Sequence, residues 1–160
     1  MYLTVNEKKV FASTGGKPFE KNQPVVLFLH GSGLDHTFWG LHSRFFAFRK
    51  YSVLCLDFPG HTHSDGPPLE SIEEMATWVN DVVIEIQASA VSVVGHSQGC
   101  LVSMEYVSKF PELVKSVSFI ASGYETPVNS FLLDAAENKP RNAIDKMISW
   151  CFDKTGHMHQ

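Results

Sequence analysis

A serine flanked by two glycines is the feature of this sequence that points most directly to chemistry. Gly95, Ser97 and Gly99 stand in the pentapeptide Gly-His-Ser-Gln-Gly, directly after the apolar run Val91–Val94. A G-x-S-x-G turn between a strand and a helix presents the serine hydroxyl clear of the sheet. The first N–H groups of the helix then face negative charge that develops on a substrate. The pattern predicts a nucleophile at Ser97 and an oxyanion donor at the backbone N–H of Gln98.

A second glycine-rich turn, His-Gly-Ser-Gly, follows the apolar run Val25–Leu29. Glycine lets a backbone approach a ligand closely. We therefore expect the N–H of Ser32, or that of Gly33, to be the second oxyanion donor. Gly31, Gly33 and Trp39 are expected to contact the substrate, and the histidine that opens the turn is expected to hold the loop. The alternative is a tight turn without chemistry.

Apolar runs alternate with helical segments, and this order must position the two turns. The apolar runs are Val25–Leu29, Ser52–Leu56, Val91–Val94 and Val117–Ile120, preceded by an opening strand or hairpin over residues 2–13. The helical segments are Asp35–Phe48, a capped helix over residues 71–86, Gly99–Lys109, Asn129–Asn138 and Pro140–Phe152. Such alternation predicts an α/β fold with a mostly parallel sheet and helices on both faces. Chemistry in such sheets lies in the loops after the carboxyl ends of the strands.

The loop after the second apolar run permits a rival interpretation as a metal site. His61, His63 and Asp65 follow the pattern H-x-H-x-D, which resembles the opening of the metallo-β-lactamase zinc motif, and His96 could supply a later ligand. The histidine expected after the aspartate is replaced by Gly66. We therefore expect a surface turn here and no metal.

Three motifs in order resemble the α/β-hydrolase superfamily. They are the turn at residues 30–33, the segment Asp-Phe-Pro-Gly-His at 57–61 followed by Ser64, and the pentapeptide at 95–99. The resemblance extends from the opening strands to about Ser122. It departs from the family pattern at Thr62, where glycine is usual, and this puts the local turn in doubt.

The resemblance implies a serine hydrolase, of esterase type, that cleaves a small apolar ester through an acyl-enzyme without a cofactor. Ser97 would be the nucleophile, with Ser32 and Gln98 as oxyanion donors. Residues 1–124 would form the hydrolase core and residues 125–160 the start of a helical cap. Apolar cap positions that could line an acyl pocket are Phe131, Leu132, Leu133, Ile144, Met147, Ile148 and Trp150.

The family's acid and histidine follow later strands, and we expect this chain to lack both residues and the last two strands of the sheet. Glu125 is a candidate acid, and His157 or His159 a candidate base. Three interpretations stay open: a serine hydrolase completed by residues outside this chain, an inactive truncated hydrolase fragment, or a non-catalytic ligand-binding module. An uncovered sheet edge favours a homo-oligomer or a complementing chain.

Composition excludes several partners. The 160 residues carry 13 Lys+Arg against 17 Asp+Glu, a net charge of −4, and show no basic stripe of the kind that binds nucleic acid. No apolar run reaches the roughly 18 residues that span a bilayer, so we expect no membrane partner. The first residues do not resemble a secretory signal. Three widely spaced cysteines, Cys55, Cys100 and Cys151, favour the reducing cytoplasm.

Overall fold

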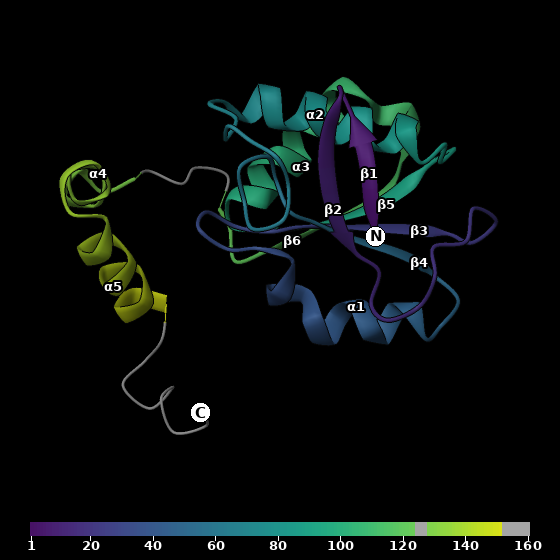
Figure 1. Cartoon of the computed structure of the whole chain (residues 1–160), viewed down its shortest axis with the longest axis horizontal. Helices are drawn as coiled ribbons and strands as arrows, with labels where there is room; N and C mark the ends of the chain where they lie inside the picture. The colour runs from purple at the N-terminus through teal and green to yellow at the C-terminus, as the bar shows by residue number, and fades with distance from the viewer. Residues whose placement is uncertain (124–127, 152–160) are drawn as a thin grey trace. The chain divides into compact units, whose positions relative to one another are not determined.

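Two compact units make up the chain in a computed structural model that describes residues 1–123 and 128–151 (Figure 1). Contacts between Cα atoms separate Met1–Tyr124 from Glu125–Gln160. The assignment of these units as a hydrolase core and the start of a cap stays a prediction.

The first unit contains a six-stranded sheet within the described residues. Its strands are β1 (Tyr2–Val5), β2 (Lys8–Ser13), β3 (Val25–Leu29), β4 (Ser52–Leu56), β5 (Val91–His96) and β6 (Val114–Ile120). The order across the sheet is β1-β2-β4-β3-β5-β6. Strands β4, β3, β5 and β6 are parallel, whereas β1 and β2 pair antiparallel. The predicted α/β class with a mostly parallel sheet is confirmed.

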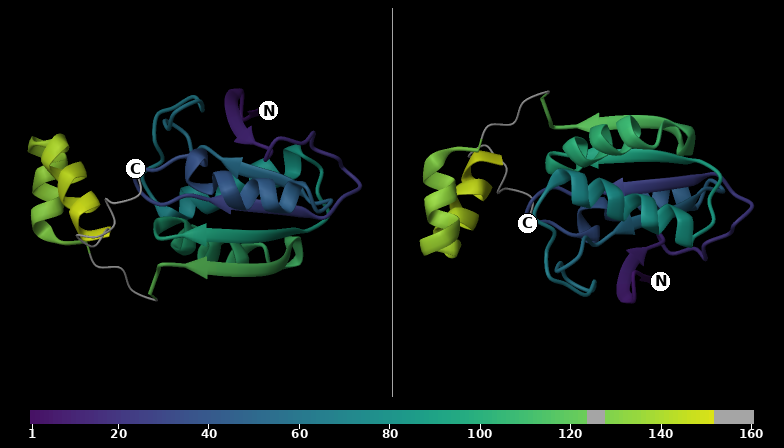
Figure 2. Two further views of the ribbon diagram at one scale, coloured as in Figure 1. Left: turned by 90° about the horizontal axis from the view of Figure 1, so that it is seen from below. Right: turned by 90° about the horizontal axis from the view of Figure 1, so that it is seen from above.

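Helices cover both faces of this sheet, as predicted (Figures 1 and 2). They are the short 3-10 helix η1 (His36–Trp39), α1 (Gly40–Ala47), α2 (Ile72–Glu85), α3 (Gln98–Lys109) and the 3-10 helix η2 (Pro111–Leu113). Helix α1 lies on one face, and α2 and α3 lie on the other (Figure 1).

Strand β3 shows why a continuous apolar run belongs in the middle of the sheet. Leu27 and Leu29 enter the core cluster that also contains residues of α2 and α3. Val26 and Phe28, which point to the opposite face, enter a second cluster with Trp39. Because successive side chains of a strand alternate between faces, a strand covered on both sides needs apolar residues throughout.

Helix α2 begins at the capping residue that the sequence predicts. The Ser71 hydroxyl accepts a hydrogen bond from the Glu74 N–H at 3.1 Å. In a complete capping box the Glu74 carboxylate would accept from the N–H of Ser71 itself, but here it accepts from the N–H of Glu70 at 3.0 Å. Both bonds satisfy N–H groups at the start of the helix or just before it, where no intrahelical acceptor exists.

The second unit consists of α4 (Ser130–Asn138) and α5 (Pro140–Cys151), which contact each other. Asn129 caps α4 through a 2.8 Å hydrogen bond from the Phe131 N–H. Ala135 and Ala143 are its buried apolar residues within the described range. Throughout the described ranges, 1–123 and 128–151, no helix has the length and apolarity needed to cross a bilayer.

Candidate active site

The turn between β5 and α3 holds Ser97 in a backbone conformation that most residues avoid. Its φ is 51° and its ψ is −118°. A Cβ atom at Gly95 would collide with the carbonyl oxygen of Gly99, and a Cβ atom at Gly99 would collide with the carbonyl oxygen of Leu29. The two glycines therefore allow a turn tight enough to place Ser97 at its tip.

Hydrogen bonds to the end of β6 hold this strained turn in place. The Ser97 N–H donates to the Ile120 carbonyl at 3.0 Å. The Cys100 thiol donates to the carbonyls of Gly95, at 3.1 Å, and Ile120, at 3.3 Å. Left-handed backbone at a residue other than glycine costs about 1–3 kcal/mol and persists where the surroundings fix it.

The loop after β3 lies directly against the nucleophile turn. A Cβ atom at Gly31 would stand 3.0 Å from the Cβ of Ser97 and 3.0 Å from the Nδ1 of His96. The Leu34 N–H donates to the Gly31 carbonyl at 3.1 Å and closes a turn that carries Ser32 at its exposed corner. The structure thus brings the loop that carries Ser32 against Ser97. Ser97 directly precedes Gln98, the first residue of α3, whose N–H has no intrahelical acceptor.

His30, which is fully buried, holds the loop after β3 in place. Its Nε2 accepts from the Phe58 N–H at 3.3 Å, so Nδ1 carries the proton and donates to the Gly31 carbonyl at 2.9 Å. Burial lowers the pKa of His30, because the charged imidazolium would lose its hydration. A neutral ring with both nitrogens engaged holds the loop, as the sequence suggested.

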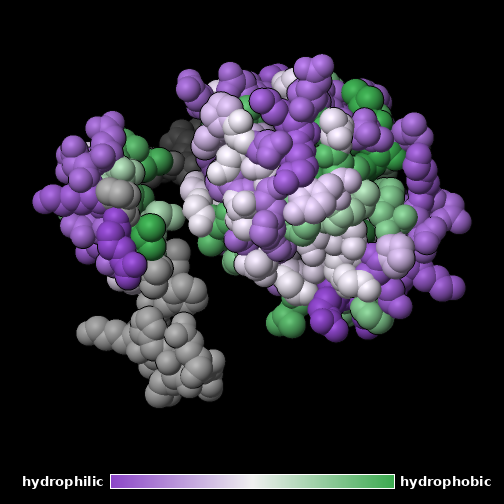
Figure 3. Space-filling view, viewed as in Figure 1, coloured by the Kyte–Doolittle hydropathy of each residue, from purple (hydrophilic) through white to green (hydrophobic). Residues whose placement is uncertain are grey.

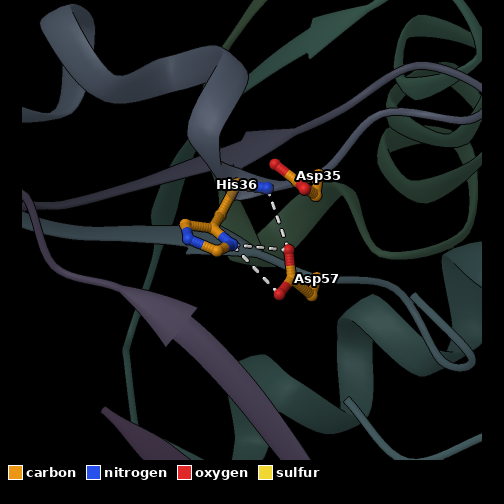
Figure 4. Close-up of side chains that lie close together, drawn as sticks. All are labelled: Asp35, His36 and Asp57. Atoms are coloured by element: carbon orange, nitrogen blue, oxygen red, sulfur yellow. Dashed lines mark hydrogen bonds and ion pairs between the residues drawn. The ribbon is translucent and has the colours of Figure 1, made fainter. Parts of the chain in front are cut away.

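A buried hydrogen-bonding partner, which the sequence interpretation missed, connects the same loop to β4 (Figure 4). Asp57 directly follows β4 and is fully buried. One of its carboxylate oxygens accepts from the His36 backbone N–H at 2.8 Å and lies 2.9 Å from the His36 Nδ1. The available signal was an aspartate at the end of a buried strand, which requires a donor from elsewhere in the chain.

Asp35, His36 and Asp57 offer donor atoms within 4.8 Å of one another. Their oxygen and nitrogen donors would suit a divalent cation. Each group already has partners, since Asp35 accepts from the Thr37 N–H at 2.7 Å and from the Thr62 hydroxyl at 3.1 Å. Burial opposes ionisation of Asp35, but hydrogen bonds from both threonines lower its pKa.

The residues of the H-x-H-x-D pattern do not converge in the structure. The His61 Nδ1 donates to the Pro59 carbonyl at 3.1 Å, and the Asp65 carboxylate accepts from the Lys9 N–H at 3.0 Å. Within the described residues, the group with metal-binding spacing is Asp35, His36 and Asp57 instead.

Thr62 and Ser64 show how the loop after β4 accommodates its departure from the family pattern. Thr62 has a φ of 40°, in the left-handed region that favours the usual glycine. Ser64 is buried and its hydroxyl donates to the Asp57 carbonyl at 2.7 Å while it accepts from the Phe11 N–H at 2.9 Å. The predicted turn therefore forms, with the threonine in strained backbone.

Trp39, expected to contact the substrate, has no exposed surface. Its ring packs on Phe28 at a centroid distance of 5.0 Å, so in this structure it fills the core. Its neighbour Phe38 is 41% exposed and stacks on His96 at 4.3 Å. Burial lowers the pKa of His96. Phe38 is the exposed aromatic residue beside the candidate site, while the buried Trp39 ring also lies 6.4 Å from that of His96.

Several predicted residues fall outside the described part of the structure. Glu125, His157 and His159 lie outside the described residues, as do the side chains of Ile148 and Trp150. Among the other predicted cap positions, the exposed ones are Phe131, Leu133 and Ile144. The half-buried ones are Leu132 and Met147.

Sequence relatives cover part of the chain and differ in what their names state. An uncharacterized protein of Mycobacterium tuberculosis is 31% identical over 102 residues, which are 62% of this chain and 29% of the relative. A protein of Haemophilus influenzae, provisionally named an esterase/lipase, is 33% identical over 62% of this chain and 34% of its own length. The chain thus spans about a third of the length of these curated relatives.

Solved structures share the fold at low identity. An epoxide hydrolase from Bacillus megaterium superposes with a TM-score of 0.68 and 18% identity, over 96% of this chain and 52% of that one. An N-acyl homoserine lactone degrading enzyme superposes with a TM-score of 0.73 and 22% identity, over 92% and 56%. At this identity, the likeness establishes the fold.

A family profile covers most of the sequence. Residues 24–156 match the family described as alpha/beta hydrolase fold. This range contains the strands β3 to β6, the glycine-rich loop and the nucleophile turn. Since the profile, the sheet topology and the turn geometry agree, the chain belongs to the alpha/beta hydrolase fold family.

Proposed function

We propose that Ser97 is the nucleophile of a serine hydrolase that cleaves small apolar esters. The observation that carries this proposal is the position of Ser97, at the tip of a strained turn with the Gly31 loop in van der Waals contact. A structural serine would gain nothing from such a conformation, whereas a nucleophile must stand clear of its own strand and helix.

In the proposed reaction, the Ser97 Oγ bonds to the ester carbonyl carbon and its proton passes to a general base. The resulting oxyanion receives hydrogen bonds from the backbone N–H groups of Gln98 and Ser32. The carbon–oxygen bond to the alcohol breaks, and the base returns its proton to the departing alkoxide. Water then attacks the acyl-enzyme by the same route and releases the carboxylic acid.

The general base is assigned to residues beyond the described ranges. Among residues 1–123 and 128–151, no side chain forms a hydrogen bond with the Ser97 hydroxyl. We propose Glu125 as the acid, residues 1–124 as the hydrolase core and residues 125–160 as the start of a helical cap. Without a base, Ser97 should react only slowly, because the serine hydroxyl is a weak nucleophile until an adjacent base removes its proton.

The relatives support ester hydrolysis among the reactions that this fold hosts. The Haemophilus influenzae relative is provisionally named an esterase/lipase, and so is a protein of Mycoplasma genitalium that is 24% identical over 78% of this chain and 47% of its own length. The exposed apolar side chains of the second unit, at Phe131, Leu133 and Ile144, are suited to an apolar acyl group.

The proposal extends to the compartment in which the chain is found and to the partner that covers strand β6 at the edge of its sheet. Cys55 and Cys100 are free and buried, which suits the cytoplasm. Strand β6 pairs with β5 and carries exposed side chains at Phe119 and Ile120. We propose that a second copy or a complementing chain covers this strand, and light scattering that finds a dilute monomer would contradict it.

A fluorophosphonate probe tests the nucleophile, because it phosphonylates activated serines. We expect the probe to label the peptide that contains Ser97, located by mass spectrometry, and added imidazole to accelerate labelling by acting as a diffusible base. Ser97→Ala should abolish the adduct, while Ser89→Ala, at an exposed serine, should leave it unchanged. Absence of the Ser97 adduct with and without imidazole would overturn the proposal.

A further inference from the structure

A row of large apolar side chains runs along the solvent-facing side of α1. Phe38, Leu41, Phe45 and Phe48 are 41%, 85%, 51% and 58% exposed. Their spacing of three, four and three residues places them on one face of a helix. These four residues are called the α1 stripe below. Single exposed apolar residues are ordinary, but a contiguous row indicates an interaction surface.

The α1 stripe points away from the sheet. Trp39, Ser43 and Ala47 form the buried side of this segment. At about 100° per residue, Leu41 lies about 200° around the helix axis from Trp39. An element packed beside α1 on the same face of the sheet would therefore leave the α1 stripe exposed.

Basic residues outnumber acidic ones around the α1 stripe, where Glu20 lines the same hollow as Phe48 and Lys50, although the chain as a whole is negative. Residues 36–51 include Arg44, Arg49 and Lys50 but no Asp or Glu, whereas the net charge of the chain is −4. The Arg49 guanidinium lies 3.6 Å from the Phe45 ring centroid, and the Lys17 ammonium lies 4.4 Å from that of Phe48. In Figure 3, green apolar and purple hydrophilic side chains adjoin at the lower edge, where Figure 1 places α1.

We infer that the α1 stripe docks on an anionic phospholipid surface. Helices that lie in the plane of a membrane combine Phe, Leu or Trp on one side with Lys and Arg beside them. The apolar rings would enter the boundary between headgroups and acyl chains, while the cations contact lipid phosphates and serine carboxylates. The expectation of no membrane partner rested on spanning segments and does not apply to a helix that lies on the surface.

The α1 stripe also adjoins the candidate active site. Phe38, at one end of the stripe, stacks on His96, the residue before Ser97. A chain docked through α1 would therefore hold the nucleophile turn close to the lipid surface. The docking itself does not depend on the proposed hydrolase activity.

Vesicle sedimentation tests the inference with the full chain. We expect binding to vesicles of phosphatidylcholine with roughly one third phosphatidylserine, and weak binding to pure phosphatidylcholine. The double variant Leu41→Ser, Phe45→Ser should weaken binding about tenfold for each side chain lost. The double variant Arg44→Gln, Arg49→Gln should weaken it about fivefold for each cation.

Matched controls separate the α1 stripe from general surface properties. Ile84→Ser removes a side chain of α2 that is 61% exposed, and it should leave vesicle binding unchanged. Lys8→Gln with Lys115→Gln removes two cations outside the stripe and should have a smaller effect than the arginine pair. Circular dichroism of each variant should show an unchanged fold, since all these side chains are exposed or half-buried.

Three results would overturn the inference. The first is equal sedimentation with anionic and neutral vesicles, and the second is an α1 stripe variant that binds like the wild type. The third is a wild-type chain that forms a dimer and does not bind vesicles, together with an α1 stripe variant that is monomeric. The stripe would then be a protein interface.

Discussion

Gly99 occupies a position where the chain passes too close to itself for any side chain. Its missing Cβ atom would meet the carbonyl oxygens of Leu29 and His30, which belong to rigid backbone. We predict that Gly99→Ala lowers the free energy of unfolding by about 3 kcal/mol, because the turn must move to admit a methyl group. Denaturant unfolding followed by circular dichroism would measure this.

Gly40 provides the matched control for that substitution. It lies in helical backbone at the start of α1, and a Cβ atom there would meet nothing within 4 Å. Gly40→Ala should therefore stabilise the fold by about 0.5 kcal/mol. Equal effects of the two substitutions would show that close backbone approach at the nucleophile turn is not what requires glycine.

Thr62 is strained in a way that two substitutions can separate. Its φ of 40° is unfavourable for a β-branched residue, and its hydroxyl donates to Asp35. Thr62→Val loses the hydrogen bond and keeps the strain, whereas Thr62→Gly loses both. We predict that the valine variant is less stable than the glycine variant by about 1 kcal/mol, measured by thermal unfolding. A more stable valine variant would contradict the strained turn.

At the scale of elements, a buried hydroxyl is one of the links between β2 and the loop after β4. Ser64 links the Phe11 N–H to the Asp57 carbonyl. Ser64→Ala would leave the N–H of the half-buried Phe11 without this acceptor, so we predict a loss of about 1–2 kcal/mol of stability. Ser89→Ala, at an exposed loop residue, should change stability by less than about 0.5 kcal/mol. Similar losses in both variants would exclude this role for Ser64.

The elements predicted from the sequence are those whose signals are local. The apolar run of β3 and the Ser71 cap of α2 both depend on neighbouring residues, and both were predicted correctly. The helix expected from Asp35 to Phe48 instead begins as η1, where Asp35 caps a 3-10 turn. The β2–β4 pairing and the His36–Asp57 contact join segments more than 20 residues apart, so no local pattern could specify them.

At the scale of the whole molecule, buried neutral histidines make stability depend on pH. Burial lowers the pKa of His30 and of His96 from the usual value near 6.5. At a pH below that value, the unfolded chain binds protons at these histidines that the folded chain does not bind. Stability should therefore reach its full value above about pH 7 and fall as the pH drops, by at most about 1.4 kcal/mol per pH unit for the fully buried His30 and by less for the half-buried His96.

His30→Gln tests the source of this dependence. The glutamine amide can supply one donor and one acceptor, as the imidazole does toward Gly31 and Phe58, but it does not titrate. Urea unfolding at pH 8, 7, 6 and 5 should give a shallower decline for the variant than for the wild type. An unchanged slope would show that His30 contributes nothing to acid sensitivity.

Fold class followed from alternating strands and helices, and the candidate nucleophile from a pentapeptide, because both are written in contiguous residues. Which aromatic side chain faces the site was not predictable, since Phe38 and Trp39 differ only in the direction that η1 gives them. The exposure of the α1 stripe was likewise not predictable from the sequence, because helical spacing alone does not show which of two apolar faces is buried.

Acyl transfer from an activated ester tests the central claim, that Ser97 is a nucleophile, most directly. The chain would be incubated with p-nitrophenyl acetate, quenched, digested and examined by mass spectrometry. The structure predicts an acetyl group on the peptide that contains Ser97, formed together with p-nitrophenolate and absent from Ser97→Ala. Acetyl groups found only on surface amines and histidines, to the same extent in Ser97→Ala, would contradict it.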